Sequence, residues 1–176
     1  VWSKRSLHLV GLGIDIQHAG LTTALQQALE FRHRRAQEIG RKLEEVGIQN
    51  AYEGACAVAG SALISRSHFA HFLVAEGHAK DIRQVFKRYM VRGKPGHVAG
   101  EWMPLAQGVE IIHAAGGVAV LAHPARYNLS RTKLRGLLKE LKGLGVDGIE
   151  VVSGSHSLEE NKVMAQHALD FDFPAS

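Results

Sequence analysis

The order of apolar and polar residues predicts an α/β scaffold that is interrupted by a group of helices. Residues 7–14 are apolar with interspersed glycines, which predicts a buried strand. Apolar residues then recur at helical spacing over 21–46, so a long helix is expected there. Thr22 or Thr23 could cap this helix, and Gly47 is placed to end it.

Three shorter helices are predicted after the long one. Residues 50–60 are rich in alanine, Ser65 is placed to cap a second helix, and residues 81–91 carry apolar side chains on one face. The segment 92–96, with the sequence RGKPG, is a loop by composition. We therefore expect residues 20–104 to form an all-helical insertion.

Strands and helices alternate in the rest of the chain. Strands are expected at residues 118–122, at 148–152 and from Phe171 onward, with helices at 105–115, 132–144 and 158–169. Such alternation predicts a parallel sheet or an α/β barrel. The expected organisation is a barrel strand in residues 1–19, the helical insertion in 20–104 and the continued barrel in 105–176.

Composition narrows the class of protein. Hydrophobic residues make up 45% and charged residues 22%, a balance typical of globular proteins, and no apolar run approaches the roughly 20 residues of a membrane helix. Cys56 is the single cysteine and cannot form an internal disulfide, so we expect a reducing, cytoplasmic setting and no membrane partner. No obligate protein partner is inferred.

Basic residues gather in three clusters, although the net charge is only +4. Each cluster is either a solvated helix face or a surface that attracts phosphate groups, those of nucleic acid included. The clusters are Arg32, Arg34, Arg35, Arg41 and Lys42; Lys80, Arg83, Lys87, Arg88, Arg92 and Lys94; and Arg131, Lys133, Arg135, Lys139 and Lys142.

Two of the eleven histidines stand out because they lie in apolar strand segments. His123 follows a hydrophobic strand, and Pro124 then forces the chain out of that strand. Active-site groups of α/β barrels project from this end of a strand, so His123 is either a metal ligand or a histidine that closes the strand by hydrogen bonding. Arg126 could present its guanidinium to a phosphate beside such a metal, and His8 is either a second ligand or a satisfied core group. His33, His78 and His167 are expected on polar helix faces or turns, without a function.

Together these segments resemble the polymerase-and-histidinol-phosphatase (PHP) family, in particular its bacterial branch of nucleotide and oligoribonucleotide phosphoesterases. The likeness covers essentially the whole chain, and AHP-x-RY at 122–127, downstream of the helical insertion, is more specific than AHP alone. The other similar segments are LHLVGL at 7–12, SRSHFA at 65–70, VFKRY at 85–89, RGKP at 92–95 and GIEV at 148–151.

The resemblance implies a distorted α/β barrel that hydrolyses phosphate esters with a metal-activated water. It implies up to three divalent metal ions, and manganese, zinc, iron and magnesium all suit histidine and carboxylate ligands to some degree. It also implies His8 and His123 as metal ligands. The substrate would be a phosphorylated nucleotide, such as a nucleoside 3′,5′-bisphosphate, or the 5′ end of a short RNA.

The insertion is expected to cover the active site and to contact the substrate. Arg66, His68, Lys94 and Arg126 are the candidates for phosphate or nucleotide contacts. For Arg66 and His68 the alternative is helix capping and surface pairing. Glu150, at the end of a barrel strand, would orient a ligand or substrate group, or else pair with an arginine.

Several metal-binding segments of the resembled family have no counterpart in the sequence. Its opening His-x-His segment and its closing Gly-Ser-Asp-x-His segment would lie before Val1 and after Ser176, and the chain begins without methionine. We therefore expect a fragment with no stable multi-metal centre and negligible activity alone. The alternative is a non-enzymatic helical module that binds nucleic acid through its basic faces.

Overall fold

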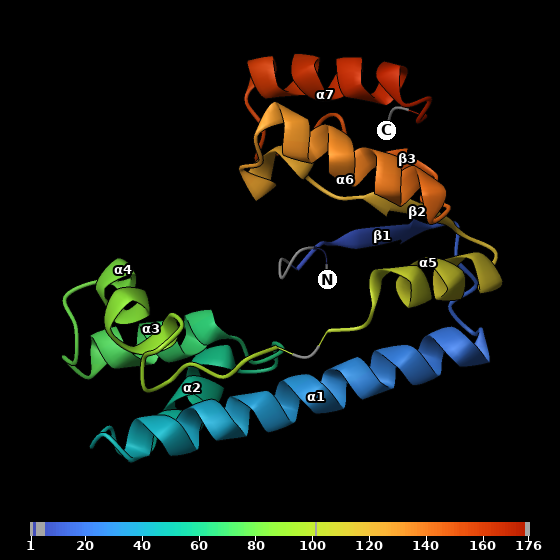
Figure 1. Cartoon of the computed structure of the whole chain (residues 1–176). Coiled ribbons are helices and arrows are strands. Elements are labelled where there is room, and N and C mark those ends of the chain that lie inside the picture. Colours follow the sequence, from blue (N-terminus) through green and yellow to red (C-terminus); the bar gives the residue numbers. More distant parts are fainter. Residues whose placement is uncertain (1, 3–5, 101, 175–176) are drawn as a thin grey trace. The chain divides into compact units, whose positions relative to one another are not determined.

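The computed structural model describes residues 2, 6–100 and 102–174, which fall into two compact units (Figure 1). We call Val1–Ala24 together with Trp102–Ser176 the sheet unit, and Leu25–Glu101 the helical unit. The predicted insertion, residues 20–104, begins and ends within a few residues of the helical unit. Its identity as a substrate-covering domain stays a prediction.

A small mixed sheet forms the centre of the sheet unit. Its strands β1 (Leu9–Leu12), β2 (Val118–Leu121) and β3 (Gly148–Ile149) lie in the order β1-β2-β3. β3 runs parallel to β2 whereas β1 runs antiparallel, so the prediction of a parallel sheet is wrong for β1. The chain leaves the sheet at Leu12 and returns at Val118, which is the direct partner of Leu12. Because it re-enters at the end where it left, β1 and β2 must run in opposite directions.

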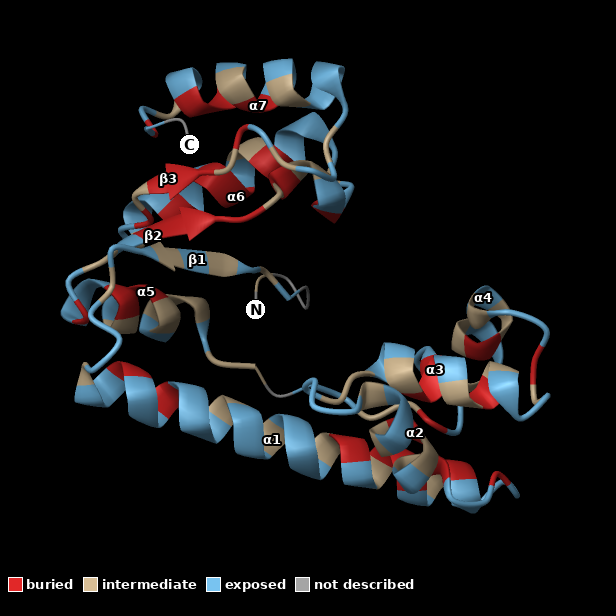
Figure 2. Ribbon diagram, turned by 180° about the vertical axis from the view of Figure 1, so that it is seen from behind, coloured by how far each residue is buried: buried red, intermediate tan, exposed pale blue. Residues whose placement is uncertain are grey.

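The strands at both ends of the sheet are shorter than predicted. The buried strand expected over 7–14 is a short edge strand, in which exposed residues alternate with partly buried ones. Its Val10 and Leu12 side chains are 41% and 46% exposed, whereas β2 and β3 are mainly buried (Figure 2). The strand expected over 148–152 is likewise short, because backbone bonding to β2 ends with the N–H of Glu150.

Helices complete the sheet unit. They are α5 (Leu105–Ala114), the short 3-10 helix η2 (Pro124–Tyr127), α6 (Arg131–Gly143) and α7 (Leu158–Asp170). In α6 the leucines recur at helical spacing, and four of them are buried in the core: Leu134, Leu137, Leu138 and Leu141. α6 lies in front of β2 and β3 in Figure 1 and behind them in Figure 2, so it covers one face of these strands.

The end of α7 corrects two predictions. Phe171 was expected to begin a strand, but it ends the helix instead, and Asp172 turns the chain with a φ of 55°. The N–H of Phe173 then bonds back to the last turn of α7, and the Phe173 ring packs in the core.

His167 was expected on a polar helix face or turn, but it is only 3% exposed. It shares a face of α7 with the buried Met164, so it does not lie on a polar face.

The helical unit has its own core. It contains most of α1 (Ala19–Glu44), with α2 (Ala51–Ala59), α3 (Arg66–Ala75), α4 (Ile82–Val85) and the π-helical segment η1 (Phe86–Met90). Its core includes Ile39, Leu43, Phe69 and Leu73. The single helix predicted over 81–91 divides into α4 and η1, because the Val91 N–H bonds to the carbonyl of Phe86, five residues back. Neither α1 nor any other helix of the described residues is long and apolar enough to cross a membrane.

The start of α1 differs from the prediction. Neither Thr22 nor Thr23 caps the helix, because both lie inside it and the Thr22 hydroxyl donates to the carbonyl of His18. The His18 side chain takes the capping role instead, since its Nδ1 accepts the N–H of Leu21 at 3.3 Å. A histidine is a less common cap than threonine, which is why sequence preference alone selected the wrong residue.

Candidate functional site

Two predicted metal ligands lie side by side at one end of β1 and β2. His8 precedes β1 and His123 closely follows β2, and the antiparallel pairing of the strands brings them together. Nδ1 of His8 lies 3.1 Å from Nε2 of His123, and the two rings meet edge to face. The carbonyl of His8 accepts the N–H of Ala122 at 2.9 Å, so backbone bonding fixes the main chains beneath the rings. The fold therefore joins two histidines that are far apart in the sequence.

The backbone of His123 adopts a conformation that is rare for residues with a side chain. Its φ of 35° and ψ of 58° lie in the left-handed region, and it directly precedes Pro124. A strained backbone of this kind costs about 1–3 kcal/mol and occurs most often at functional sites. The Glu150 carboxylate helps to hold the conformation by accepting the His123 N–H at 2.5 Å. Nδ1 of the His123 ring is buried and has no hydrogen-bond partner among the described residues.

Tyr127 ties the two histidine segments together. Its buried hydroxyl donates to the carbonyl of Ala122 at 3.1 Å and accepts the N–H of His8 at 2.9 Å. Burial raises the pKa of this hydroxyl, so it stays protonated and keeps its donor role. Tyr127 belongs to the AHP-x-RY segment, but this contact could not be predicted from the sequence, because spacing does not show which backbone groups a hydroxyl reaches.

Arg126 and Glu150 lie close to the same hydroxyl. Besides burial, the charge of Arg126 lowers the pKa of Tyr127 and the charge of Glu150 raises it. Arg126 is exposed on η2, next in the chain to Tyr127. The orienting role predicted for Glu150 has a counterpart in its bond to the His123 N–H. Both roles toward a ligand stay predictions.

The other three predicted contacts belong to the helical unit. Arg66 begins α3 and is exposed, and its guanidinium carbon lies 5.7 Å from the centre of the Phe86 ring. His68 lies in the first turn of α3, where its Nδ1 accepts the N–H of Ser65 at 3.2 Å, which is the capping contact named as its alternative. Lys94 is exposed in the loop after η1. Their contacts with a substrate stay predictions.

The histidine pair can be tested for its fit to the metal that the resemblance implies. Two imidazole nitrogens 3.1 Å apart are close enough to bind one ion with bonds of about 2.1 Å, provided that both rings are neutral. The described residues contain no group of three or more His, Cys, Asp and Glu side chains that could hold a metal. His8 and His123 thus fit two positions of a coordination shell and do not complete it.

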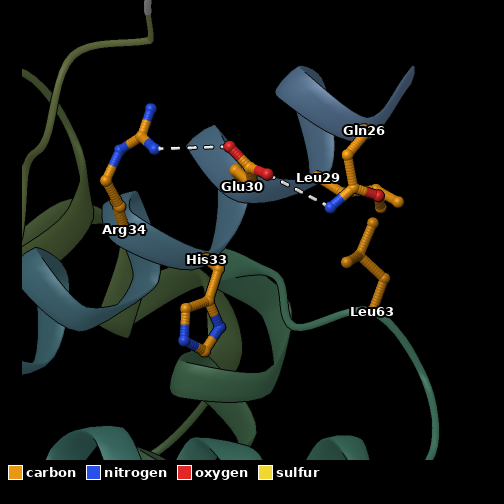
Figure 3. Close-up of a pocket in the computed structure, with 6 residues that line it drawn as sticks. All are labelled: Gln26, Leu29, Glu30, His33, Arg34 and Leu63. Atoms are coloured by element: carbon orange, nitrogen blue, oxygen red, sulfur yellow. Dashed lines mark hydrogen bonds and ion pairs between the residues drawn. The ribbon is translucent and has the colours of Figure 1, made fainter. Parts of the chain in front are cut away.

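A hollow on the helical unit contains none of the predicted site residues. It has a volume of about 450 Å³ and is lined by Gln26, Leu29, Glu30, His33, Arg34 and Leu63 (Figure 3). The Glu30 carboxylate accepts from Gln26 and pairs with Arg34 at 3.9 Å, so these three polar side chains of the hollow are engaged with one another. We assign no function to this hollow.

Comparison with known proteins extends these observations. No family model matches the chain. The chain is 41% identical over 175 residues to a 5′-3′ exoribonuclease of Haemophilus influenzae, and 43% identical over 168 residues to a 3′,5′-nucleoside bisphosphate phosphatase of Chromobacterium violaceum. These matches cover 99% and 95% of the chain but 64% and 59% of the relatives, so the chain spans about three fifths of their length.

Two solved structures resemble the fold. One, from Chromobacterium violaceum, is described as an amidohydrolase with bound sulfate and no metal; it has a TM-score of 0.87 and 41% identity over 99% of this chain and 62% of its own. The other, from Bifidobacterium adolescentis, is described as a proposed metal-dependent phosphoesterase. It has a TM-score of 0.79 at 21% identity, covering 100% of this chain and 63% of its own, and it shows a likeness of fold alone.

The fold and these likenesses define the class as an α/β protein related to bacterial exoribonucleases and nucleotide phosphatases. The exoribonuclease and the bisphosphate phosphatase are homologues of this chain, which confirms the resemblance inferred from the sequence. The described residues form a three-stranded sheet, so the complete barrel stays a proposal.

Proposed function

We propose that this chain is the part of a metal-dependent phosphoesterase that supplies two metal ligands and the unit that contacts the substrate. The substrate would be a nucleoside 3′,5′-bisphosphate or the 5′ end of a short RNA, the classes that the names of the relatives indicate. A distorted α/β barrel would complete the small sheet. The observation that carries the proposal is the 3.1 Å contact between the rings of His8 and His123.

Different residues of the sheet unit would bind the metal, support its ligands and orient the phosphate. A divalent ion of manganese, zinc, iron or magnesium, when bound, supplies a water of lowered pKa and offsets phosphoryl charge. His8 and His123 would bind this ion as neutral imidazoles. Glu150 and Tyr127 hold the main chains of the two histidines, which keeps the rings at a fixed separation. Arg126 would orient a phosphate oxygen through its paired N–H donors.

The helical unit would recognise the substrate by charge. Arg66 and Lys94 are exposed cations suited to phosphate oxygens. The Nδ1 of His68 accepts a backbone N–H, so a neutral His68 ring would donate to the substrate through Nε2. These contacts come from a helix start and a loop, and the attraction between opposite charges that they supply acts over a longer range than a metal–ligand bond.

Metal binding by the chain itself tests the histidine pair. In calorimetric titration with zinc, we expect His123→Ala to weaken binding at least about tenfold. His71→Ala, which removes an exposed histidine of α3, should leave the affinity unchanged. Circular dichroism would establish that both variants are folded. Equal affinities for the two variants would contradict the assignment of His8 and His123 as a metal-binding pair.

Hydrolysis is tested by phosphate release from adenosine 3′,5′-bisphosphate in the presence of manganese. We expect negligible release by the 176-residue chain, because two neutral imidazoles cannot balance the charge of two or three divalent ions. A protein extended by the flanking sequence of its own gene should be active, and His8→Ala or His123→Ala should abolish that activity. Strong hydrolysis by the 176-residue chain would contradict the assignment of an incomplete site.

A second candidate function is metal-independent binding of nucleic acid, which the distribution of charge favours. The helical unit contains twelve lysines and arginines against eight acidic residues, whereas the sheet unit contains nine of each. RNA binding that falls steeply with salt, needs no metal and survives His8→Ala would support this candidate.

A further inference from the structure

Arg35, on α1, holds the segment that follows the Lys94 loop. Its Nε and Nη2 both donate to the carbonyl oxygen of Val98, at 3.1 and 2.9 Å. About two turns further along α1, Lys42 donates to the neighbouring carbonyl of His97 at 3.4 Å. Two cations on one face of α1 therefore bind consecutive carbonyl groups of this segment.

The same segment packs against α1 and closes on itself. Gly96 is buried, and a Cβ added to it would lie 3.0 Å from the side chain of Leu43 in α1. The N–H of Lys94 bonds to the carbonyl of Val91, and the N–H of His97 bonds to the carbonyl of Lys94, each at 3.0 Å. The exposed Lys94 side chain thus projects from a loop whose base is fixed.

Arg35 is also close to two other arginines of the helical unit. Burial lowers the pKa of Arg35, and the charges of Arg66 and Arg32 lower it further. Arg66 begins α3, so the charge at the start of that helix acts on Arg35.

We propose that Arg35 is a positioning residue of the substrate site, which fixes the base of the Lys94 loop so that Lys94 contacts a phosphate-bearing ligand. The inference rests on the proposed function. Arg35 acts through Val98 and does not need to contact the ligand itself. Lysine cannot replace it, because an ammonium group lacks the planar fork that binds one carbonyl twice.

The test compares Arg35→Lys with the matched control Arg34→Lys in the full chain. Both variants keep the charge and lie on α1, but Arg34 is exposed and pairs with Glu30 on the same helix. Hydrogen exchange at the Lys94 and His97 amides should become faster in Arg35→Lys and stay unchanged in Arg34→Lys. Adenosine 3′,5′-bisphosphate, titrated without metal, should bind about tenfold more weakly to Arg35→Lys and with unchanged affinity to Arg34→Lys.

The outcomes separate this role from the proposed function. Faster amide exchange with unchanged nucleotide affinity would make Arg35 a structural residue only and would overturn its positioning role. Unchanged amide exchange in Arg35→Lys would overturn that role as well. If the unmodified chain does not bind the nucleotide, the proposed substrate contact fails and the role of Arg35 fails with it. Arg35→Gln, which removes the charge as well as the fork, should bind more weakly than Arg35→Lys. Melting temperatures establish that each variant is folded.

Discussion

The two units of the chain combine charge and geometry differently. The helical unit carries twelve lysines and arginines against eight acidic residues, so it holds the whole net charge of +4, whereas the sheet unit carries nine of each. Yet the sheet unit contains the contact between His8 and His123 and the strained backbone beside it. Excess positive charge and fixed side-chain geometry therefore lie in different parts of the fold.

This difference reflects opposite demands on structure. A metal ligand must be held within a fraction of an ångström, which a strand end with bonded backbone groups can provide. Tyr127 and Glu150 supply such bonds to the main chains of the two histidines. An anion is attracted by the summed field of many charges, and exposed helices supply that field, so only the few side chains that contact the anion need a fixed position.

The contrast between the two units requires that each unit can unfold independently of the other. Leu141 and Leu73 are both fully buried, in the cores of the sheet unit and the helical unit respectively. Replacing either by alanine should lower the free energy of unfolding by about 2–5 kcal/mol, because each substitution leaves a cavity. Hydrogen exchange should show lost protection only in the unit that carries the substitution. Lost protection across both units in either variant would contradict this independence.

The helical unit was also the easier one to predict from sequence. Apolar residues that recur every three or four positions mark the buried face of a helix within one short segment, so most helices could be predicted. Ser65 precedes α3 as expected. The strand errors arose because pairing joins distant segments. Neither the antiparallel direction of β1 nor the helix end at Phe171 has a local signal. Burial of His167 likewise depends on which face of α7 meets the core.

The candidate site shows the same limit at the level of single side chains. His8 and His123 could be recognised because each is a polar residue in or beside an apolar strand. The contacts that support them could not, because a long side chain can reach several backbone groups and only the fold selects one. The bonds of the Tyr127 hydroxyl, the Glu150 carboxylate and the Arg35 guanidinium are of this kind.

Two helical glycines sharpen the comparison between the units. A Cβ on Gly40 in α1 would lie 2.5 Å from Cβ of Tyr52 and 3.1 Å from its Cα, whereas a Cβ on Gly136 in α6 meets nothing within 4 Å. Alanine favours a helix interior over glycine by about 1 kcal/mol, so Gly136→Ala should stabilise the sheet unit by up to that amount. Gly40→Ala should destabilise the helical unit by about 1–3 kcal/mol, because the backbone of α2 must move.

Urea unfolding of the two glycine variants measures whether their changes in the free energy of unfolding have opposite signs. The pair shares the same chemical change in the same kind of element, so a difference between them reports packing and not helix preference. A stabilising effect of Gly40→Ala would mean that α1 and α2 separate enough to admit the added Cβ, which otherwise lies 2.5 Å from Cβ of Tyr52. It would also show that the helical unit tolerates movement between its helices.

The smallest expected effect is a pH dependence confined to the sheet unit. Burial lowers the pKa of His167, the nearby Arg135 and Arg131 lower it further, and Asp170 opposes them. The unfolded chain, with a histidine pKa of about 6.5, therefore binds more protons than the folded chain, and stability is present in full above that pH. It should decrease as the pH falls below about 6.5. His167→Leu should flatten this decrease in urea unfolding curves, whereas His71→Leu in α3 should not.

The carboxylate of Asp170 cannot cause the loss of stability below about pH 6.5, because it loses its own contribution to stability at a lower pH. Hydrogen bonds from Gln166 and Arg135 lower the pKa of Asp170. Its stabilising contribution is therefore kept until the pH falls below about 3.9, the value of an unperturbed aspartate. Measurements between pH 5 and 8 thus exclude the contribution of Asp170. An unchanged slope in His167→Leu over this range would mean that the buried ring contributes no pH dependence to the sheet unit.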